Sequence, residues 1–323
     1  MRSQLDALSP SSSPQHHWFR LLFRWQGSVV PAVLPRTLLC AGFGLLISLL
    51  YRWGLPVSLQ SLSSIVPSIV LGLLLVFRTN TAYERFWEGR KLWGGLVNTS
   101  RNLARQMWVA VHEHEARDHQ EKIQQLRLLV AFARATKQQL RSTPLVTTEM
   151  ATLVTAPQLA KLQTMHHPPL EIAFWLADYL QGCFNQGRLN AYQLSAMLAQ
   201  VDIMVDVLGG CERIVKTPIP LAYAIHLKQL LLLYCLALPF QMVGALQDWT
   251  ALAVGLISFT VFGIEAIGIE IENPFGCDPN DLPLEAICQT MQRNIEDLIT
   301  LTPDNCHWRE DATPSGSTAL PLA

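Results

Sequence analysis

Four stretches of the chain are apolar and long enough to cross a lipid bilayer as helices, for which about 20 residues suffice. These predicted spans cover residues 29–51, 58–77, 221–243 and 249–267. Only a short connection separates the first two, so we expect them to form an antiparallel hairpin. Arg36 interrupts the first span near its start, where a long side chain can extend to the aqueous interface.

A dense basic segment follows the second span directly. No charged side chain occurs between Trp53 and Phe77, and the segment FRTNTAYERFWEGRKLWGGLVNTSRNLARQ (77–106) then brings several arginines and a lysine. Basic segments of this kind mark the cytoplasmic end of a membrane helix. Apolar side chains continue at helical spacing into the segment, so we predict one long helix that leaves the membrane and enters a soluble domain.

The polar regions of the chain predict an all-α cytosolic part. Residues 79–219 predict a cytosolic helical domain, and residues 269–302 predict a C-terminal cytosolic helical segment. Apolar residues recur at helical steps and strand patterns are nearly absent, so the predicted fold class is an all-α membrane protein. The helices predicted outside the membrane cover residues 120–140, 170–188, 190–215 and 284–301, with breaks near Gly187 and at Gly209-Gly210.

The predicted spans form two pairs, in residues 29–78 and 220–268, so both termini are expected to lie on the same side of the membrane. The basic segment after the second span indicates that this is the cytoplasmic side. Aromatic and basic side chains in residues 16–28 predict an interfacial helix on that surface. The Ser- and Pro-rich residues 1–15 and the tail 303–323 predict disorder.

The composition fits a membrane protein with a sizeable aqueous part. Half of the 323 residues are hydrophobic and 15% are charged, whereas soluble domains carry about 25% charged residues. The formal net charge of -1 argues against nucleic acid as a partner, since nucleic-acid binding favours a strongly basic face. The seven cysteines form no CxxC pair, which favours a reducing compartment over a disulfide framework.

The sequence lacks the motifs of common enzymes. His112, His114 and His119 lie in VHEHEARDHQ, which does not have the HExxH spacing of a zinc site, so we expect a solvated polar loop there. No nucleophile elbow, phosphate-binding loop or dinucleotide fingerprint occurs, and we predict no enzyme activity. Glu265 near the end of the fourth span and His226 near the start of the third leave open a secondary transporter that couples a solute to protons.

Three large apolar side chains in the second span, Ile69, Leu73 and Phe77, lie four residues apart and therefore share one narrow helical stripe. Two interpretations remain open from the spacing. The stripe packs against lipid or other helices, or it faces the axis of a ring of subunits. In the second case it would form a hydrophobic constriction that gates ions by dewetting, and the positive ring edges of Phe77 would favour an anion.

Four segments of the chain resemble the bestrophin family, especially its bacterial branch. They are the segment at 77–106, WFRLLFRWQGSVVPAVLPRTLL, GGCERIVKTPIPLAYAIHL and ENPFGCDPNDLPLEAIC. The resemblance implies a bestrophin-like homopentameric ion channel, with four transmembrane helices per subunit continuous with a helical cytosolic domain. It matches the pore neck of the family to Ile69, Leu73 and Phe77. Animal members carry Phe where this chain has Leu73, which leaves fewer aromatic edges in the neck.

The resemblance also implies a candidate calcium site. In animal bestrophins an acidic run after NPFG binds Ca²⁺ together with backbone carbonyls. Asp278 and Asp281 match two of the carboxylate positions, and Glu270 and Asn273 could supply further oxygens, of which calcium needs six to eight. Other residues replace the rest of the run. The alternative therefore remains that Asp281 caps the helix beginning near Pro283, and Ca²⁺ is not expected to be an obligatory cofactor.

On this resemblance, the chain is expected to pass small monovalent ions passively, with chloride and bicarbonate favoured over cations. Its expected partners are further copies of itself, membrane lipid and small inorganic ions, and no nucleic acid. The expected location is the plasma (inner) membrane, or a thylakoid membrane in a photosynthetic host. Besides the proton-coupled transporter, a non-conducting membrane scaffold that acts through its cytosolic domain remains an alternative.

Overall fold

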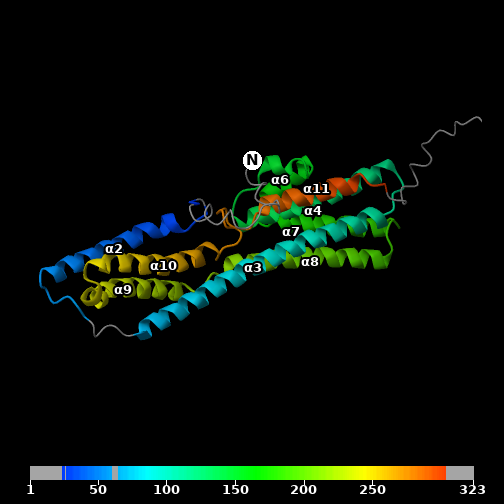
Figure 1. Ribbon diagram of the computed structural model, residues 1–323. Coiled ribbons are helices and arrows are strands. Elements are labelled where there is room, and N and C mark those ends of the chain that lie inside the picture. The colour runs from blue at the N-terminus through cyan, green and yellow to red at the C-terminus, as the bar shows by residue number, and fades with distance from the viewer. Residues whose placement is uncertain (1–23, 26, 60–64, 303–323) are drawn as a thin grey trace, which may run out of the picture. The chain divides into compact units, whose positions relative to one another are not determined.

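The computed structural model describes residues 24–25, 27–59 and 65–302. Every regular element within these residues is a helix, as the sequence predicts (Figure 1). The helices belong to two compact units of the chain. They are α2 (Val30–Arg52), α3 (Ile65–Ala110), α4 (Ala116–Leu140), α5 (Thr147–Met150), α6 (Ala156–Thr164), α7 (Pro168–Asn185), α8 (Ala191–Lys216), α9 (Leu221–Leu246), the 3₁₀ helix η5 (Gln247–Trp249), α10 (Thr250–Glu270) and α11 (Leu284–Ile299).

The first unit contains α2, the part of α3 up to Tyr83, α9, η5 and α10. Helices α2, α9 and α10 contact one another and lie side by side in Figure 1. Their bounds lie within a few residues of those of the first, third and fourth predicted spans. The second span begins later than predicted. Ser58 and Leu59 are not helical, because the Leu59 backbone N–H donates to the carbonyl of Phe240 (2.9 Å) instead of joining a helix, and α3 is described from Ile65.

Two predicted regions at the ends of the chain fall largely outside the described residues. These are the tails 1–15 and 303–323 and most of the predicted interfacial helix over residues 16–28. The described residues of the latter, namely Arg24, Trp25, Gly27 and Ser28, are not helical.

Small residues bring α2 and α10 close together. A Cβ atom on Gly44 would lie 3.2 Å from the Cα atom of Ala251, and one on Gly255 would lie 3.3 Å from the Cβ atom of Ala41. Lipid tails are as apolar as the helices, so association in a membrane depends on this kind of close van der Waals packing. The glycines therefore explain why α2 and α10 form a tightly packed pair.

By length and composition, four stretches of the described helices could cross a membrane. Three of them overlap the predicted spans: Val30–Arg52, Val66–Ala110 and Leu221–Glu270, the last of which combines α9 and α10. The other stretch, Ala191–Lys216, is α8. Helix α8 contributes its apolar side chains to the core of the second unit, so we assign the four spans to α2, the first part of α3, α9 and α10.

The second unit contains the rest of α3, from Glu84 onward, together with α4 to α8 and α11. One continuous cluster of buried apolar side chains from these helices forms its core. Helix α4 contacts α7, α8 and α11, and its residues 128–138 are all buried. A helix that is buried all round is the central helix of a core, so the helix predicted over residues 120–140 organises this unit.

The glycines expected to break the cytosolic helices have two different roles. Gly187 has a φ of +73° and follows the end of α7, which confirms the break predicted there. The break predicted at Gly209-Gly210 is wrong, because α8 continues unbroken to Lys216. A Cβ atom on Gly210 would lie 3.0 Å from Cδ2 of Leu92, so this glycine allows α3 and α8 to pack closely.

The histidine-rich segment is not the solvated loop that the sequence predicts. Glu113 and His119 are buried, and Nδ1 of His119 lies 3.0 Å from Oε2 of Glu113. Glu113 also pairs with the buried Lys122 (2.6 Å), whose ammonium donates to the carbonyl of Val111 (2.8 Å) and lies 5.3 Å from the centre of the Trp108 ring. The other two histidines are exposed. The charges are buried because Glu113 pairs with His119 and Lys122 of α4 beside Trp108 of α3. The polar composition of the segment does not reveal this packing.

Lys137 joins α4 to two carboxylates. Its ammonium lies 2.6 Å from Glu285 on α11 and 3.1 Å from Glu149 on α5. Burial alone would lower the pKa of Lys137, but the hydrogen bonds to both carboxylates outweigh it and raise that pKa. Burial would likewise raise the pKa of Glu285, and the contact with Lys137 lowers it below its ordinary value. Both shifts mean that the charged pair is stabilised in the folded state.

The Glu285→Gln variant should lose stability in a pH-dependent way. A carboxyl group whose pKa is lowered by folding stabilises the protein above its unfolded-state pKa, about 4.3, and loses that contribution as the pH falls through the folded pKa. At pH 7 we expect the variant to unfold at a lower temperature than the native protein. The loss in free energy of unfolding should be no more than roughly 1 kcal/mol, because Glu285 is half-exposed. Thermal unfolding followed by circular dichroism between pH 3 and pH 8 measures the difference.

Glu296→Gln is the matched control, because Glu296 lies exposed on the same helix and forms no ion pair among the described residues. The unfolding temperature of this control should stay close to that of the native protein between pH 3 and pH 8. A Glu285→Gln difference that persisted undiminished at pH 3 would show that the pair with Lys137 is not its origin.

Candidate functional site

Helix α3 has two opposite faces within the first unit. Leu71, Leu75 and Ala82 are buried at steps that bring them to one side of the helix. Ile69, Leu73 and Phe77 lie on the other side, because an α-helix turns once in 3.6 residues and positions 71 and 75 are about half a turn away from 69, 73 and 77. Their exposed fractions are 53%, 53% and 63%.

The exposure of this stripe narrows the first of the two interpretations that the sequence leaves open, because it excludes packing against other helices of the same unit. Ile69, Leu73 and Phe77 do not pack in the interior of their own unit. Their surroundings must come from lipid or from another copy of the chain. Their assignment to a pore neck stays a prediction.

Hydrogen bonds to α9 position the exposed stripe. The Tyr223 hydroxyl donates to the carbonyl of Leu74 (2.7 Å), and the hydroxyls of Ser68 and Tyr234 lie 3.3 Å apart. The first contact joins α3 to α9 next to Leu73, and the second lies between one and two turns away, at Ser68. They hold the helix with Leu73 turned outward.

A buried ion pair lies where α3 leaves the apolar span. The Arg78 side chain is only 4% exposed, and its Nη2 lies 3.1 Å from Oε2 of Glu272, just after α10. The other carboxylate oxygen of Glu272 accepts the backbone N–H of Ile219 (3.1 Å), which precedes α9. Arg78 packs beside Gly268, whose added Cβ would lie 3.6 Å from the arginine Nε. One arginine therefore joins α3 to the ends of two other spans.

The NPF turn packs on α3 within the second unit. Phe275 is fully buried, and its carbonyl accepts a hydrogen bond from Nε of Arg141 (3.0 Å). A Cβ atom on Gly89 would lie 3.0 Å from the Phe275 ring and 3.0 Å from Cγ of Pro274. The glycine in the FWEGR segment is therefore required by a close approach of two rigid rings.

Arg85 and Glu88 of the same segment hold the C-terminal end of α8. The Arg85 guanidinium donates to the carbonyl of Ile214 (2.6 Å) and to that of Thr217, and Glu88 pairs with Arg213 (2.7 Å). The last carbonyls of a helix have no partner within the helix, and a cation there is also favoured by the helix dipole. These charged residues of the basic segment are structural.

The four candidate calcium residues are divided between the two units. Asn273 and Asp281 belong to the second unit and surround Gly276, whose added Cβ would lie 2.5 Å from Oδ2 of Asp281 and 3.5 Å from Nδ2 of Asn273. Glu270 and Asp278 belong to the first unit. The N-cap of α11 is Pro283, whose side chain makes no capping hydrogen bond. The alternative expectation, that Asp281 caps the last helix, stays a prediction.

An amide occupies part of the calcium candidate in the first unit. Nδ2 of Asn280 donates to Oε1 of Glu270 (3.2 Å) and to the carbonyl of Gly27 (3.0 Å). Both amide protons of Asn280 thus have oxygen acceptors, which fixes its orientation. Calcium binding at these residues stays a prediction.

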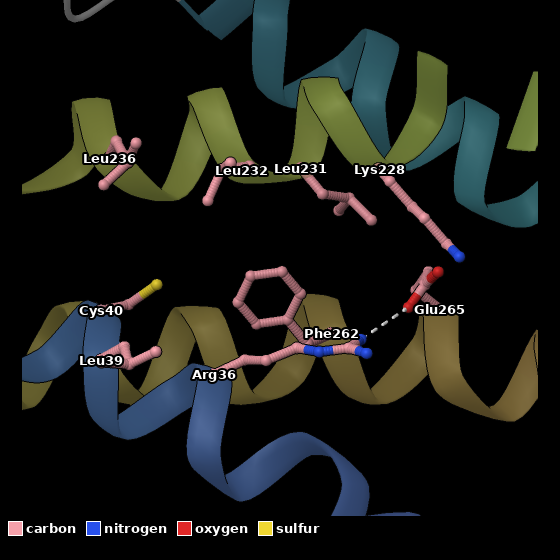
Figure 2. A pocket seen from close by; sticks show the side chains of 9 residues that line it. All are labelled: Arg36, Leu39, Cys40, Lys228, Leu231, Leu232, Leu236, Phe262 and Glu265. Atoms are coloured by element: carbon pink, nitrogen blue, oxygen red, sulfur yellow. Dashed lines mark ion pairs between the residues drawn. The ribbon is translucent and has the colours of Figure 1, made fainter. Parts of the chain in front are cut away.

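A groove between α2, α9 and α10 holds the charged residues of the membrane spans (Figure 2). Its cavity volume is about 280 Å³. Glu265 is buried, with its side chain 2% exposed, and its carboxylate lies 3.7 Å from Nη1 of Arg36. Lys228 points toward the same carboxylate in Figure 2. His226, the other candidate for proton coupling, is exposed and does not line the groove.

Sequence reasoning misses the partners of these charges. Arg78 follows the apolar span directly and Glu272 is the first residue of the ENPFG segment, but their pairing joins residues far apart in the chain. The same holds for Arg36 and Glu265. The available signal is that a charge within or at the end of a span must find a partner, since an unpaired charge in hydrocarbon is costly.

The spans, the helical second unit and the outward stripe of α3 define a polytopic, all-helical membrane protein. The family described as "Bacterial/Fungal Bestrophin protein" matches residues 10–297. The chain therefore belongs to the bacterial and fungal bestrophin family.

Similar proteins cover nearly the whole chain. A "Voltage-dependent anion channel-forming protein" of Synechocystis sp. is 62% identical over 91% of this chain and 95% of its own length. A protein of the same description from Nostoc sp. is 59% identical over 89% and 94%. A crystal structure of a bacterial bestrophin homologue from Klebsiella pneumoniae superimposes with a TM-score of 0.78 and 31% identity, covering 86% of this chain and 100% of that chain. The expected bestrophin fold is thus confirmed.

The Gly89→Ala variant should be destabilised. The added methyl group would meet a phenylalanine ring and a proline ring, and neither can move as a flexible side chain does. We expect a loss of about 1–3 kcal/mol, the usual effect of overpacking, measured as a lower thermal unfolding temperature of the detergent-solubilised protein.

Gly182→Ala is the matched control, because Gly182 lies within α7 and an added Cβ there meets nothing within 4 Å. Alanine in an open helical position is more favourable than glycine by about 0.5–1 kcal/mol, so this variant should be slightly stabilised. Equal effects of the two substitutions would contradict the close packing at Gly89.

Proposed function

We propose that the chain is the subunit of a homopentameric bestrophin-type channel that passes small ions passively. The observation that carries the proposal is the outward stripe of Ile69, Leu73 and Phe77, which lies opposite the buried face of α3. Copies of α3 around one axis would bring these side chains together as three apolar rings. Such rings form a hydrophobic constriction, in which dewetting holds back ions until the neck widens.

Anions are the proposed permeant species, with chloride first and bicarbonate also accepted. The descriptions of the Synechocystis and Nostoc relatives name anion channels, which supports this choice. The ring edges of Phe77 carry a partial positive charge that favours an anion over a cation. Leu73 supplies no such edges, so Phe77 bears the aromatic contribution of the neck.

The proposed orientation places both termini on the cytoplasmic side of the plasma membrane. Basic side chains such as Arg85, Arg90 and Lys91 follow the second span, and cytoplasmic regions next to membrane helices carry an excess of Lys and Arg. A thylakoid membrane would fit the same rule in a photosynthetic host.

One observation favours a second function, a proton-coupled transporter. Glu265 is buried beside Arg36 in the groove within the spans, and buried carboxylates in membrane helices are used as proton carriers. A transporter would show saturable uptake and countertransport in liposomes, whereas a channel gives discrete current steps in a planar bilayer.

The test of the channel is a bilayer recording of the purified protein under a potassium chloride gradient. We expect discrete current steps whose reversal potential lies toward the chloride equilibrium potential. Replacing Ile69, Leu73 and Phe77 together with Ala should raise the open probability at least severalfold, because the neck widens and wets more easily.

The matched control replaces Leu38, Leu45 and Leu46 with Ala, since these leucines are equally exposed but lie on α2. It should leave currents and reversal potential unchanged. Currents unaltered by the α3 triple variant would remove its stripe from the pore, and a reversal potential at the potassium value would overturn anion selectivity.

Calcium is proposed not to be required for opening. The Asn280 amide holds an oxygen of Glu270 that a cation would need, and asparagine stands there where animal family members continue their acidic run. Bilayer currents should therefore be the same in micromolar calcium and in excess chelator. Opening that rises with calcium in the native protein and not in an Asp278→Asn, Asp281→Asn variant would establish the calcium site instead.

A further inference from the structure

The groove of the first unit has a charged end and an apolar end (Figure 2). Arg36, Lys228 and Glu265 form the charged end. Arg36 is the seventh residue of α2, Lys228 the eighth of α9, and Glu265 the sixth from the end of α10. At 1.5 Å per residue, all three lie roughly 8–11 Å inside the helix ends. We place this level near the boundary between lipid headgroups and acyl chains, because the polar layers of a bilayer add about 5–8 Å to each side of its hydrocarbon core.

The charged end has an excess of one positive charge. The Glu265 carboxylate lies near Arg36, whose side chain is 56% exposed and can reach outward. Lys228 forms no ion pair or hydrogen bond with any residue that the structure describes. A lysine within a membrane span without an anion is costly. The groove therefore needs one negative charge from outside the unit.

The apolar end of the groove extends deeper into the membrane along two helices. Leu232 and Leu236 follow Lys228 at one and two turns on α9, and Phe262 lies nearly one turn deeper than Glu265 on α10. In Figure 2 the leucines and Phe262 face each other across the gap. The polarity of the groove thus changes in the same direction as that of a membrane lipid.

We propose that this groove binds a diacyl phospholipid with a net negative headgroup. The phosphate would lie between Lys228 and Arg36, and one acyl chain would lie along Leu232, Leu236 and Phe262. A phosphodiester without a headgroup cation neutralises the excess charge of the groove, whereas a choline headgroup brings its own positive charge close to two cations. This site depends on the membrane placement of the helices and not on ion conduction.

The test compares retained lipid in purified protein. The full chain is reconstituted in vesicles of dioleoylphosphatidylglycerol and dioleoylphosphatidylcholine in equal amounts, extracted in mild detergent, and examined by native mass spectrometry. We expect phosphatidylglycerol to be retained over phosphatidylcholine. Lys228→Gln should reduce the retained phosphatidylglycerol about tenfold, and Leu232→Trp, which fills the apolar end, should reduce it as well.

Arg52→Gln is the matched control, because Arg52 is a cation at the opposite end of α2 and pairs with Asp248. It should keep the native lipid pattern, which separates this groove from general attraction of anionic lipid to basic residues. Adding sodium oleate or inorganic phosphate should not displace the phospholipid. Displacement by oleate would identify a fatty-acid site instead and overturn the proposal.

Two further outcomes would also overturn it. Equal retention of both lipids by the native protein would show that the groove does not select for charge. Native retention in both Lys228→Gln and Leu232→Trp would place the lipid elsewhere, as expected if another copy of the chain covers the groove. Thermal unfolding in the same detergent, with and without added phosphatidylglycerol, supplies a second readout. The lipid should stabilise the native protein and the Arg52→Gln variant but not Lys228→Gln.

Discussion

The ion pair between Arg78 and Glu272 fixes the rotation of α3 about its own axis. Apolar contacts cannot do this inside a membrane, because lipid offers a leucine nearly the same environment as a neighbouring helix. A buried arginine has to face its carboxylate, since leaving either charge unpaired would cost several kcal/mol. With Arg78 turned toward Glu272, the stripe that contains Leu73 is turned outward. The proposed pore surface is thus a consequence of a polar contact on the opposite face.

The extent of each span could be predicted from sequence because it depends on a local property. Apolar length alone gives the bounds of α2, α9 and α10 closely, and the outward stripe follows from residues four apart. The burial of the cluster of Glu113, His119 and Lys122 could not be predicted, because its members are close in sequence but are covered by packing against Trp108 of α3. The polar composition of this segment predicts that it is exposed, whereas its burial results from tertiary contacts.

Glycine positions illustrate the same limit. The break near Gly187 could be predicted, since a positive φ is a backbone property that glycine tolerates. Gly210 and Gly89 are required for a different reason, because each lies against a side chain that is far away in sequence. The candidate site depends more on glycines that allow close packing, such as Gly89. The NPF turn can reach α3 only where α3 has no Cβ.

Tyr223 occupies the first turn of α9, directly after the chain enters the membrane unit. Its hydroxyl is bonded to the peptide carbonyl next to Leu73. A shift of that first turn must therefore stretch or carry along the backbone of α3 at the level of the stripe. The Tyr223 hydroxyl group thus couples the start of α9 to the backbone of α3. Through it, a displacement of the first turn of α9 would reach α3 at the level of the proposed neck without passing through the lipid.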